Sequence, residues 1–303
     1  MAAEENEMGI SVVLPNFNGR QLLQQNLPSL YDALNKAEFP YEVIVADDCS
    51  TDDSIEYLKR DYPATITVST STNSGFSTAC NTGIAATQYS YTCIVNTDVT
   101  FDSEYFINSM KYFEDPKLFA IKGEINNYIE RMDDIFNVEK EIVVYFKRGF
   151  FKFKPSDLRD KVNYDRSLVL LGCCFVCRTE LIKKLGGFDE RFSPYYWEDL
   201  DLPLTVIEQG YNLVYAPDCR VYHQRSSTIN KTQRKTKVRL ISNRNKFILA
   251  WKHFDSPAKW VIHVLWVLVS LCTRWIKLDW QYYVSLCYAL ARYPKSRRDS
   301  INT

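Results

Sequence analysis

The sequence has no excess of charge of either sign and no paired cysteine spacing. Lysine plus arginine and aspartate plus glutamate each number 37, so the formal net charge is zero. A nucleic-acid-binding protein would usually carry a basic excess. The nine cysteines are scattered, and the acidic first ten residues contain no apolar signal segment. These absences argue against a nucleic-acid-binding protein and predict a cytoplasmic chain with free thiols.

Several signatures of cofactor and covalent chemistry are also missing. The chain has neither a Gly-x-Gly-x-x-Gly motif nor a glycine-rich loop ending in Lys-Ser or Lys-Thr, so neither a dinucleotide oxidoreductase nor a P-loop nucleoside triphosphatase is predicted. No clear Ser/His or Cys/His arrangement indicates a covalent nucleophile. One Cys-x-x-Cys, Cys174 to Cys177, lies in an apolar run with no second pair at zinc-site spacing. We therefore expect these cysteines to pack as small hydrophobes.

Short apolar runs alternate with helical patterns in the first part of the chain. Strands are predicted at residues 10–14, 41–46, 65–69 and 91–95, and helices at residues 20–34, 53–60, 76–86 and 104–113. Such alternation is typical of a parallel α/β sheet, whose ligands bind at the carboxyl ends of the strands. Later in the chain, strands are predicted at residues 168–177, 212–215 and 220–222, and helices at residues 179–185 and after Glu198.

Two further segments combine aromatic or apolar residues with basic ones. Residues 145–154 alternate aromatic and basic side chains, which fits a contact with an acceptor or a membrane but is better explained by a half-buried amphipathic strand. Residues 260–276 form an apolar run shorter than the roughly 20 residues of a spanning helix. We expect that run to lie at a membrane interface or against the core, with peripheral membrane contact through residues 260–298.

Polar residues cluster where the predicted strands end. Asp47 and Asp48 can accept hydrogen bonds from a ribose or a base, although the same segment is also a good turn, with Ser50 or Thr51 capping the next helix. Small residues at 73–77 would let the backbone N–H groups of a helix start approach a phosphate. Asp98 follows a strand and is either a turn acid or a ligand for Mg²⁺ or Mn²⁺.

Three acids, Glu198, Asp199 and Asp201, lie within four residues of one another after an aromatic run. Carboxylates this close repel one another, which indicates a cation or a proton-transfer step, and their crowding would raise a carboxylate pKa. His223 ends a predicted strand and is either a core histidine or a metal ligand. Arg244 and residues 225–227 are weaker candidates for a diphosphate contact.

Seven ordered motifs give the chain a resemblance to a known family. They are VVLPNFNG, VADDCSTDDS, NSGFSTACNTGI, NTDV, GGFDERF, YWEDLDL and the Tyr222-His223 segment, spread over roughly residues 10–225. In their order and spacing they resemble the motifs of family 2 glycosyltransferases. The most similar subgroup is the rhamnosyltransferase-like enzymes of bacterial cell-surface polysaccharide assembly.

This resemblance implies a GT-A fold: a Rossmann-like, mostly parallel α/β sheet flanked by helices. A catalytic domain would span residues 1–229, with a nucleotide-binding half at about 10–122 and an acceptor-binding half at about 123–229. Residues 230–303 would form a C-terminal helical extension. The implied activity is inverting transfer from a UDP, dTDP or GDP sugar to a glycan or lipid-linked acceptor with Mn²⁺ or Mg²⁺, and the implied location is the cytoplasm, peripherally on the inner face of the membrane.

The resemblance also assigns roles to individual residues. Asp199 matches the general base, Glu198 is the second catalytic acid, and Asp98 and His223 match the metal ligands. Asn96 stands where the family's metal motif has its first acid. The residues implied to contact the nucleotide sugar are Pro15, Asn16, Asn18, Asp47, Asp48, Asn73, Gly75, Phe76, Asn81, Asn96, Thr97 and Trp197.

Two other functions stay open at this stage. Asn96 in place of an acid would suit a nucleotide-sugar-binding protein that has lost turnover. A nucleotidyltransferase would also place a nucleotide on an α/β sheet. Such enzymes generally need a basic, glycine-rich loop after the first strand, where this chain has residues 15–19 followed by the single basic residue Arg20.

Overall fold

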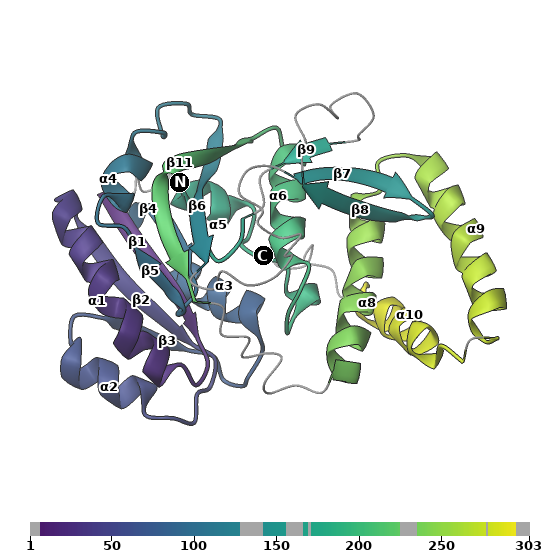
Figure 1. Ribbon diagram of the computed structural model, residues 1–303, viewed down its shortest axis with the longest axis horizontal. Helices are drawn as coiled ribbons and strands as arrows, with labels where there is room; N and C mark the ends of the chain where they lie inside the picture. The colour runs from purple at the N-terminus through teal and green to yellow at the C-terminus, as the bar shows by residue number, and fades with distance from the viewer. Residues whose placement is uncertain are drawn as a thin grey trace, which may run out of the picture.

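The computed structural model describes residues 7–127, 142–155, 166–168, 171–224, 235–276 and 278–294. Within these ranges an eight-stranded sheet carries helices on both faces, and a three-stranded sheet and three C-terminal helices lie beside it (Figure 1). The order in the large sheet is β3-β2-β1-β4-β10-β6-β11-β5.

The first four strands confirm the predicted parallel α/β unit. They are β1 (Glu7–Asn16), β2 (Tyr41–Asp47), β3 (Ile66–Ser69) and β4 (Tyr89–Val95), all paired in parallel. The helices between and after them are α1 (Arg20–Ala37), α2 (Ser54–Asp61), α3 (Phe76–Ala86) and α4 (Tyr105–Met110). Val12 and Val45 pack on one face of the sheet and Val13 and Ile44 on the other. Burial of both faces explains why these strands are continuous apolar runs.

The other half of the sheet is mixed, so the prediction of a parallel sheet is wrong there. Strand β10 (Cys174–Arg178) runs antiparallel to β4 and also to β6 (Leu118–Asn127). The two short strands predicted at 212–222 are one strand, β11 (Asn212–His223), whose pairing register with β6 shifts between Ala216 and Arg220. The strand predicted at 168–177 is also wrong. It is divided between β9 (Arg166–Leu168) of the small sheet and β10 of the large one.

The cysteines of β10 lie in the core. Cys174 and Cys177 are 1% and 0% exposed, and all nine cysteines of the chain are free. Burial raises the pKa of the Cys177 thiol well above its ordinary range. These thiols therefore pack as small hydrophobes, as predicted.

The aromatic and basic segment at 145–154 is a hairpin rather than the single strand that its alternation predicted. Strands β7 (Ile142–Lys147) and β8 (Phe150–Pro155) pair antiparallel around Arg148 and Gly149. Both turn residues have positive φ, 52° and 77°, as in the two-residue turns that suit the twist of a hairpin. The three-residue strand β9 completes this small sheet against β7.

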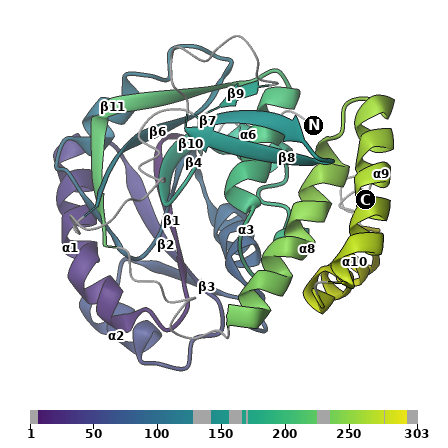
Figure 2. The same cartoon turned by 45° about the vertical axis from the view of Figure 1, so that its right-hand side comes forward.

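Three helices follow: α8 (Lys235–His253), α9 (Pro257–Arg274) and α10 (Trp280–Arg292). Helix α8 lies between the main body and the outer pair α9 and α10 (Figure 2). One apolar cluster joins Val144 of the hairpin, Leu204 of α6 (Glu198–Glu208), Phe247 of α8 and Ala289 of α10. In the described part of the chain, none of the helices combines the length and apolar character needed to cross a bilayer.

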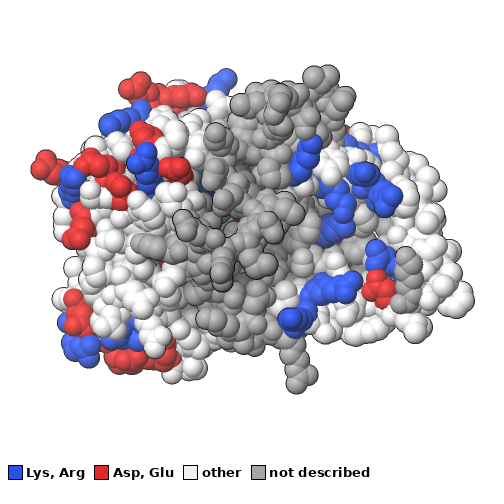
Figure 3. Space-filling model, in the orientation of Figure 1, with Lys and Arg blue, Asp and Glu red and all other residues white. Residues whose placement is uncertain are grey.

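Charge is unevenly distributed on the face drawn in Figure 3. Acidic side chains gather over the half that contains the large sheet, whereas the half formed by the hairpin and α8 to α10 shows mainly basic side chains. A white, uncharged margin lies beyond the basic region, over α9. On this face the two halves thus differ in charge despite the net charge of zero.

Candidate functional site

The carboxyl ends of β1 and β2 bring the first predicted site residues together. Asn16 and Asp47 are neighbours in the strand register, and Asn16 Nδ2 donates to Asp47 Oδ1 at 2.9 Å. The backbone N–H of Ser50 donates to Asp47 Oδ2 at 2.9 Å. Both Asn16 and Asp47 are buried. Their hydrogen bonds therefore join the ends of β1 and β2 at this edge of the sheet.

The loop after Asp48 corrects one prediction. Neither Ser50 nor Thr51 caps the next helix, because α2 begins after Asp53 and the N–H of its first residue, Ser54, donates to Asp52 Oδ1 at 3.2 Å. Ser50 Oγ instead accepts from the backbone N–H of Asn18 at 2.8 Å, and Asn18 Oδ1 accepts from Thr51 N at 2.7 Å. These bonds hold the loops after β1 and β2 against each other.

The first N–H groups at the start of α3, which we predicted to approach a phosphate, make bonds within the protein. Asp48 already accepts from the backbone N–H groups of Ser74, at 2.8 Å, and Gly75, at 2.7 Å. Phe76 N donates to the carbonyl of Pro194 at 3.1 Å. These bonds hold the start of α3 against the end of β2 and the segment at residue 194, and contacts of Gly75 and Phe76 with a donor stay a prediction. Asn73, just before them, is exposed.

Gly75 allows a second loop to approach the start of α3. Its φ is +93°, and a Cβ there would lie 2.4 Å from Pro194 Cα. Only glycine tolerates both that conformation and that contact. The segment around residue 194 is thereby placed beside the carboxyl ends of the first strands.

Asn81 has a structural role, and its predicted contact with the donor stays a prediction. Its Nδ2 donates to the carbonyl of Phe188 at 2.8 Å and to Glu190 Oε1 at 2.9 Å, and its Oδ1 accepts from Phe188 N at 2.8 Å. Both polar groups of the amide are therefore engaged. Asn81 fixes the segment that follows the Gly186-Gly187 turn, whose glycines both have φ of 70°.

The segment leading to the acid cluster is held in an unfavourable backbone conformation. Tyr196 and Trp197 both have positive φ, 72° and 80°, and each such residue costs on the order of 1–2 kcal/mol. Helix α8 opposes this cost. Asn245 Nδ2 donates to the carbonyls of Phe192, Tyr195 and Tyr196 at 2.6, 3.0 and 2.9 Å.

Two more residues of α8 hold the same segment. Arg244 donates to the carbonyl of Ser193 at 2.5 Å, and Ser242 Oγ accepts from Trp197 Nε1 at 3.0 Å. We call Ser242, Arg244 and Asn245 the α8 clamp. Arg244 is 8% exposed, and burial lowers its pKa to about 10. The idea that Arg244 contacts a diphosphate is therefore not supported, because its guanidinium holds the loop.

The sequence analysis missed the α8 clamp. One signal was present: Arg244 and Asn245 stand directly before the buried apolar run Phe247–Trp251, which an exposed polar helix would not contain. Polar residues on the buried face of a helix need partners. Backbone carbonyls some 50 residues away are partners that no local pattern indicates.

Glu198 and Asp199 are the first two residues of α6. Asp199 is exposed, whereas Glu198 is half-buried and its Oε2 has no hydrogen-bond partner in the described part of the chain. Burial and the neighbouring Asp199 raise the pKa of Glu198 to about 8. Surrounding protein also raises the pKa of Asp199, although the residue as a whole is exposed. Near neutral pH, Glu198 thus keeps a proton.

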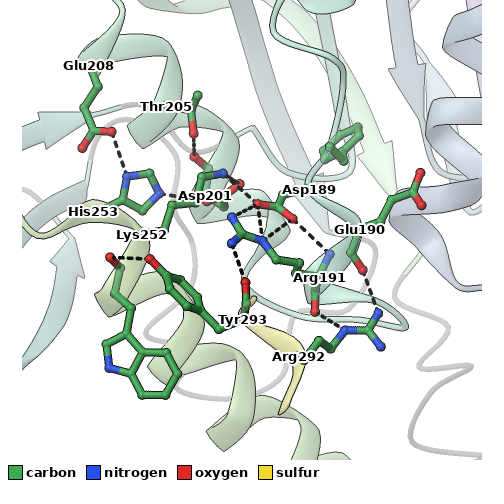
Figure 4. A network of polar contacts seen from close by, with 12 residues as sticks. Asp189, Glu190, Arg191, Asp201, Thr205, Glu208, Lys252, His253, Arg292 and Tyr293 are labelled. Carbon is green, nitrogen blue, oxygen red and sulfur yellow. Dashed lines mark hydrogen bonds and ion pairs between the residues drawn. The ribbon is translucent and has the colours of Figure 1, made fainter. Parts of the chain in front are cut away.

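Asp201 is separated from these two acids and lies in a buried ion network (Figure 4). It accepts from Lys252 Nζ at 2.7 Å and faces His253 Nε2 at 2.8 Å. Lys252 also reaches Asp189, which pairs with Arg191. Burial opposes ionisation, but Lys252 and His253 nevertheless hold the pKa of Asp201 below its ordinary value. Asp201 is therefore a structural acid of this network rather than a third member of a crowded acid cluster.

Asp98 and His223, the predicted metal ligands, lie side by side. His223 Nε2 is 3.2 Å from Asp98 Oδ1, because β11 pairs with β5 (Val99–Phe101) and places His223 opposite Val99. A carboxylate oxygen and an imidazole nitrogen suit Mn²⁺ or Mg²⁺. No group of three or more potential ligands occurs among the described residues. These two residues therefore fit a metal whose other ligands come from a diphosphate and water.

The remaining predicted residues are accounted for briefly. Asn96 and Thr97 form the turn before Asp98, where Asn96 N donates to the carbonyl of Cys173 and the carbonyl of Thr97 accepts from Asn26. Pro15 is half-buried at the end of β1. Residues 225–227 lie outside the described residues.

Comparisons with known proteins agree with this geometry. Residues 11–186 match the family model of glycosyl transferase family 2, and residues 100–294 match that of glycosyl transferase family group 2. A pre-mycofactocin glycosyltransferase of Mycobacterium tuberculosis is 27% identical over 210 residues, which are 66% of this chain and 41% of the relative. The chain thus spans less than half the length of that curated relative.

Solved structures show the same fold. A mannosyltransferase from Pyrobaculum calidifontis, in complex with GDP-Man and Mn²⁺, aligns over 96% of this chain and 76% of its own, with a TM-score of 0.55 and 16% identity. TarS 1-349 of S. aureus, in complex with UDP-GlcNAc, aligns over 95% and 82%, with a TM-score of 0.57 and 16% identity. The sheet and its helices have the GT-A arrangement, and the family match covers more than half of the sequence, so the chain belongs to glycosyl transferase family 2.

Proposed function

We propose that this protein transfers a sugar, with inversion, from a nucleotide diphosphate sugar to a hydroxyl of a glycan or lipid-linked acceptor. The observation that carries the proposal is the carboxyl pair Glu198 and Asp199, whose raised pKa values suit proton transfer. The Asp98–His223 pair lies at the strand ends of the same sheet and supplies the second feature that such a reaction needs.

Asp199 is the proposed general base. An acceptor hydroxyl is a weak nucleophile, so a carboxylate takes its proton as the oxygen attacks the anomeric carbon. The nucleoside diphosphate leaves from the opposite face of the sugar. Glu198 keeps its own proton near neutral pH and is the proposed contact of an acceptor hydroxyl, while its Oε2 is buried without a hydrogen-bond partner among the described residues. No covalent enzyme intermediate is required.

Asp98 and His223 would hold Mn²⁺ or Mg²⁺ at the donor diphosphate. When bound, the ion offsets the negative charge that develops on the leaving group. The nucleoside would lie over the loops after β1, β2 and β4. The proposed contacts are Pro15, Asn16, Asn18, Asp47, Asp48, Asn73, Gly75, Phe76, Asn81, Asn96, Thr97 and Trp197. Similar structures carry GDP-mannose and UDP-GlcNAc, which makes both nucleotides first choices for a donor panel.

The biological setting extends the same proposal. A rhamnosyltransferase-like role in cell-envelope polysaccharide synthesis would place the protein in the cytoplasm, at the inner face of the membrane. The exposed apolar residues of α9 support such a contact. The division into residues 1–229 and 230–303 also stays a prediction, and the apolar cluster that joins α6 to α8 crosses it.

The first experiment is nucleoside diphosphate release with Mn²⁺ and a panel of UDP, GDP and dTDP sugars. We expect Asp199→Asn to lower the rate by about 10²–10⁴-fold. Glu180→Gln, an exposed acid on α5 (Thr179–Lys184), is the matched control and should leave the rate unchanged. Full activity of Asp199→Asn would remove the base assignment.

Two outcomes would favour the other functions. Nucleotide binding in calorimetry without turnover on any acceptor would indicate a binding protein, as Asn96 in place of an acid would allow. Release of pyrophosphate from a nucleoside triphosphate and a sugar phosphate would indicate a nucleotidyltransferase.

A further inference from the structure

A cavity of about 590 Å³ lies between the β7–β8 hairpin and helices α8 to α10. Five basic side chains line it: Lys147, Arg148, Lys152, Lys246 and Arg274. None of the residues that line it is acidic. The proposed sugar transfer makes no use of this cavity, since none of the predicted site residues lines it.

Lys152 and Arg274 of this basic cavity lie close enough to Lys246 to act on it as like charges. Lys246 lies 4.4 Å over the ring of Phe150, and burial together with neighbouring Lys152 lowers its pKa to about 7. Arg274 pairs with Asp279. The four other cations show no acidic partner within the described ranges. Like charges held together in this way are stabilised by an anion.

An exposed apolar surface adjoins the basic cavity. Trp266, Ser270 and Arg274 line the cavity from one side of α9. The neighbouring positions Val261 and Leu265 of the same helix are 58% and 57% exposed. The exposed apolar face of α9 and the turn after it comprises Trp260, Val261, Ile262, Val264, Leu265, Leu268, Val269, Trp275, Ile276 and Leu278. In the described part of α9 only His263 is buried.

A ligand for this region must match both features. A soluble anion would satisfy the cations but leave the apolar face of α9 in water. A lipid bilayer with anionic headgroups offers a phosphate for the cavity and an apolar layer for the helix, and an amphipathic helix that lies in such an interface combines these two contacts. The white margin beside the basic region in Figure 3 has this arrangement.

We propose that the basic cavity binds the phosphate of an anionic phospholipid while the apolar face of α9 lies in the membrane interface. Each lysine that meets the anionic headgroups contributes to binding, as does each apolar side chain that leaves water. The inference rests on the membrane contact proposed for α9 but not on sugar transfer.

The test is flotation of the full chain with vesicles of phosphatidylcholine alone and vesicles that also contain phosphatidylglycerol. We expect the wild type to float with the second kind, and Lys152→Gln/Lys246→Gln to bind it at least about tenfold more weakly. The matched control, Lys59→Gln/Lys117→Gln, removes two exposed lysines elsewhere and should float like the wild type. Leu265→Glu, on the apolar face, should weaken binding to both kinds of vesicle.

Each result separates the two proposals. If the cavity variant floats like the wild type while Leu265→Glu does not, the headgroup site is wrong and the membrane contact stands. If the wild type does not float, or if glycerol phosphate alone binds the cavity as tightly as the vesicles do, the phospholipid assignment is overturned. Nucleoside diphosphate release with a soluble acceptor should be equal in the cavity variant and the wild type. If neither the wild type nor the cavity variant released nucleoside diphosphate, sugar transfer would be refuted, and the flotation result would still stand.

Discussion

Asn245→Ala tests whether the α8 clamp positions the catalytic acids. Asn245 is 0% exposed, and its two amide protons serve three carbonyls of the segment before Glu198. Loss of two buried hydrogen bonds costs about 2–3 kcal/mol, at roughly 1–1.5 kcal/mol each. For a chain of this length, the thermal midpoint should fall by about 4 °C.

The effect on catalysis should exceed the effect on folding. Tyr196 and Trp197 hold positive φ at a combined cost of about 2–4 kcal/mol. This cost is similar to what Asn245 contributes, so without the amide the segment should relax and displace Glu198 and Asp199. A displacement of about 1 Å lowers a rate by about a hundredfold. We therefore expect kcat/KM for donor turnover to fall by about ten- to a hundredfold at a temperature where the variant stays folded.

Urea unfolding and steady-state turnover of the same samples provide the measurement. Asn243→Ala is the control, because Asn243 lies on the same helix but lines the basic cavity rather than the clamp. It should change the free energy of unfolding by less than about 1 kcal/mol and leave kcat/KM unchanged. If Asn245→Ala loses the expected stability and keeps its full kcat/KM, α8 stabilises the fold without positioning the acids.

Three further predictions address the loop contact, the docking of α9 and the metal pair. Gly75→Ala should lower the free energy of unfolding by about 3 kcal/mol or more, because its Cβ would meet Pro194. Gly210→Ala, with φ +80° in open space, should cost only about 1 kcal/mol, and equal losses would contradict the close approach. Burial lowers the pKa of His263, whose neutral ring accepts from Trp251 Nε1 at 2.8 Å and donates to the carbonyl of Gly149 at 2.6 Å. The imidazole of His263 binds a proton near pH 6.5 in the unfolded chain, whereas it stays neutral in the folded chain. The contribution of His263 to the free energy of unfolding is therefore complete above that pH and lost below it. The difference in urea midpoint between wild type and His263→Gln should therefore shrink on acidification, and a constant difference would exclude this assignment. His223→Ala should weaken Mn²⁺ binding in calorimetry by about ten- to a hundredfold, and unchanged Mn²⁺ affinity would remove His223 from the metal site.

The sequence predicted the parts of the fold that depend on local patterns. Strands β1 to β4 are apolar runs bounded by turn residues, and their polar ends meet at one edge because the strands are parallel. Asp98 and His223 are 125 positions apart in the sequence. Their proximity was predicted from the family resemblance alone, and the structure places them side by side. Metal binding by this pair stays a proposal.

The errors concern contacts between distant segments. Ser50 makes its bonds to the loop after β1 rather than to its own helix, and Gly75 gives its N–H to Asp48. Arg244 is on a helix, where a surface ion pair is the usual expectation, yet it bonds to a carbonyl 51 residues away. In each case the residue bonds to a distant segment, which local sequence patterns do not indicate.

The α8 clamp also limits how this chain can be divided. A truncation at residue 229 would follow the predicted domain boundary and remove Ser242, Arg244 and Asn245 together. The carbonyls of residues 192, 193, 195 and 196 would lose their donors, and the apolar side of α6 would lose Phe247. A minimal enzyme or a chimera built on this scaffold must therefore inherit α8 with the catalytic half, as one recombination unit.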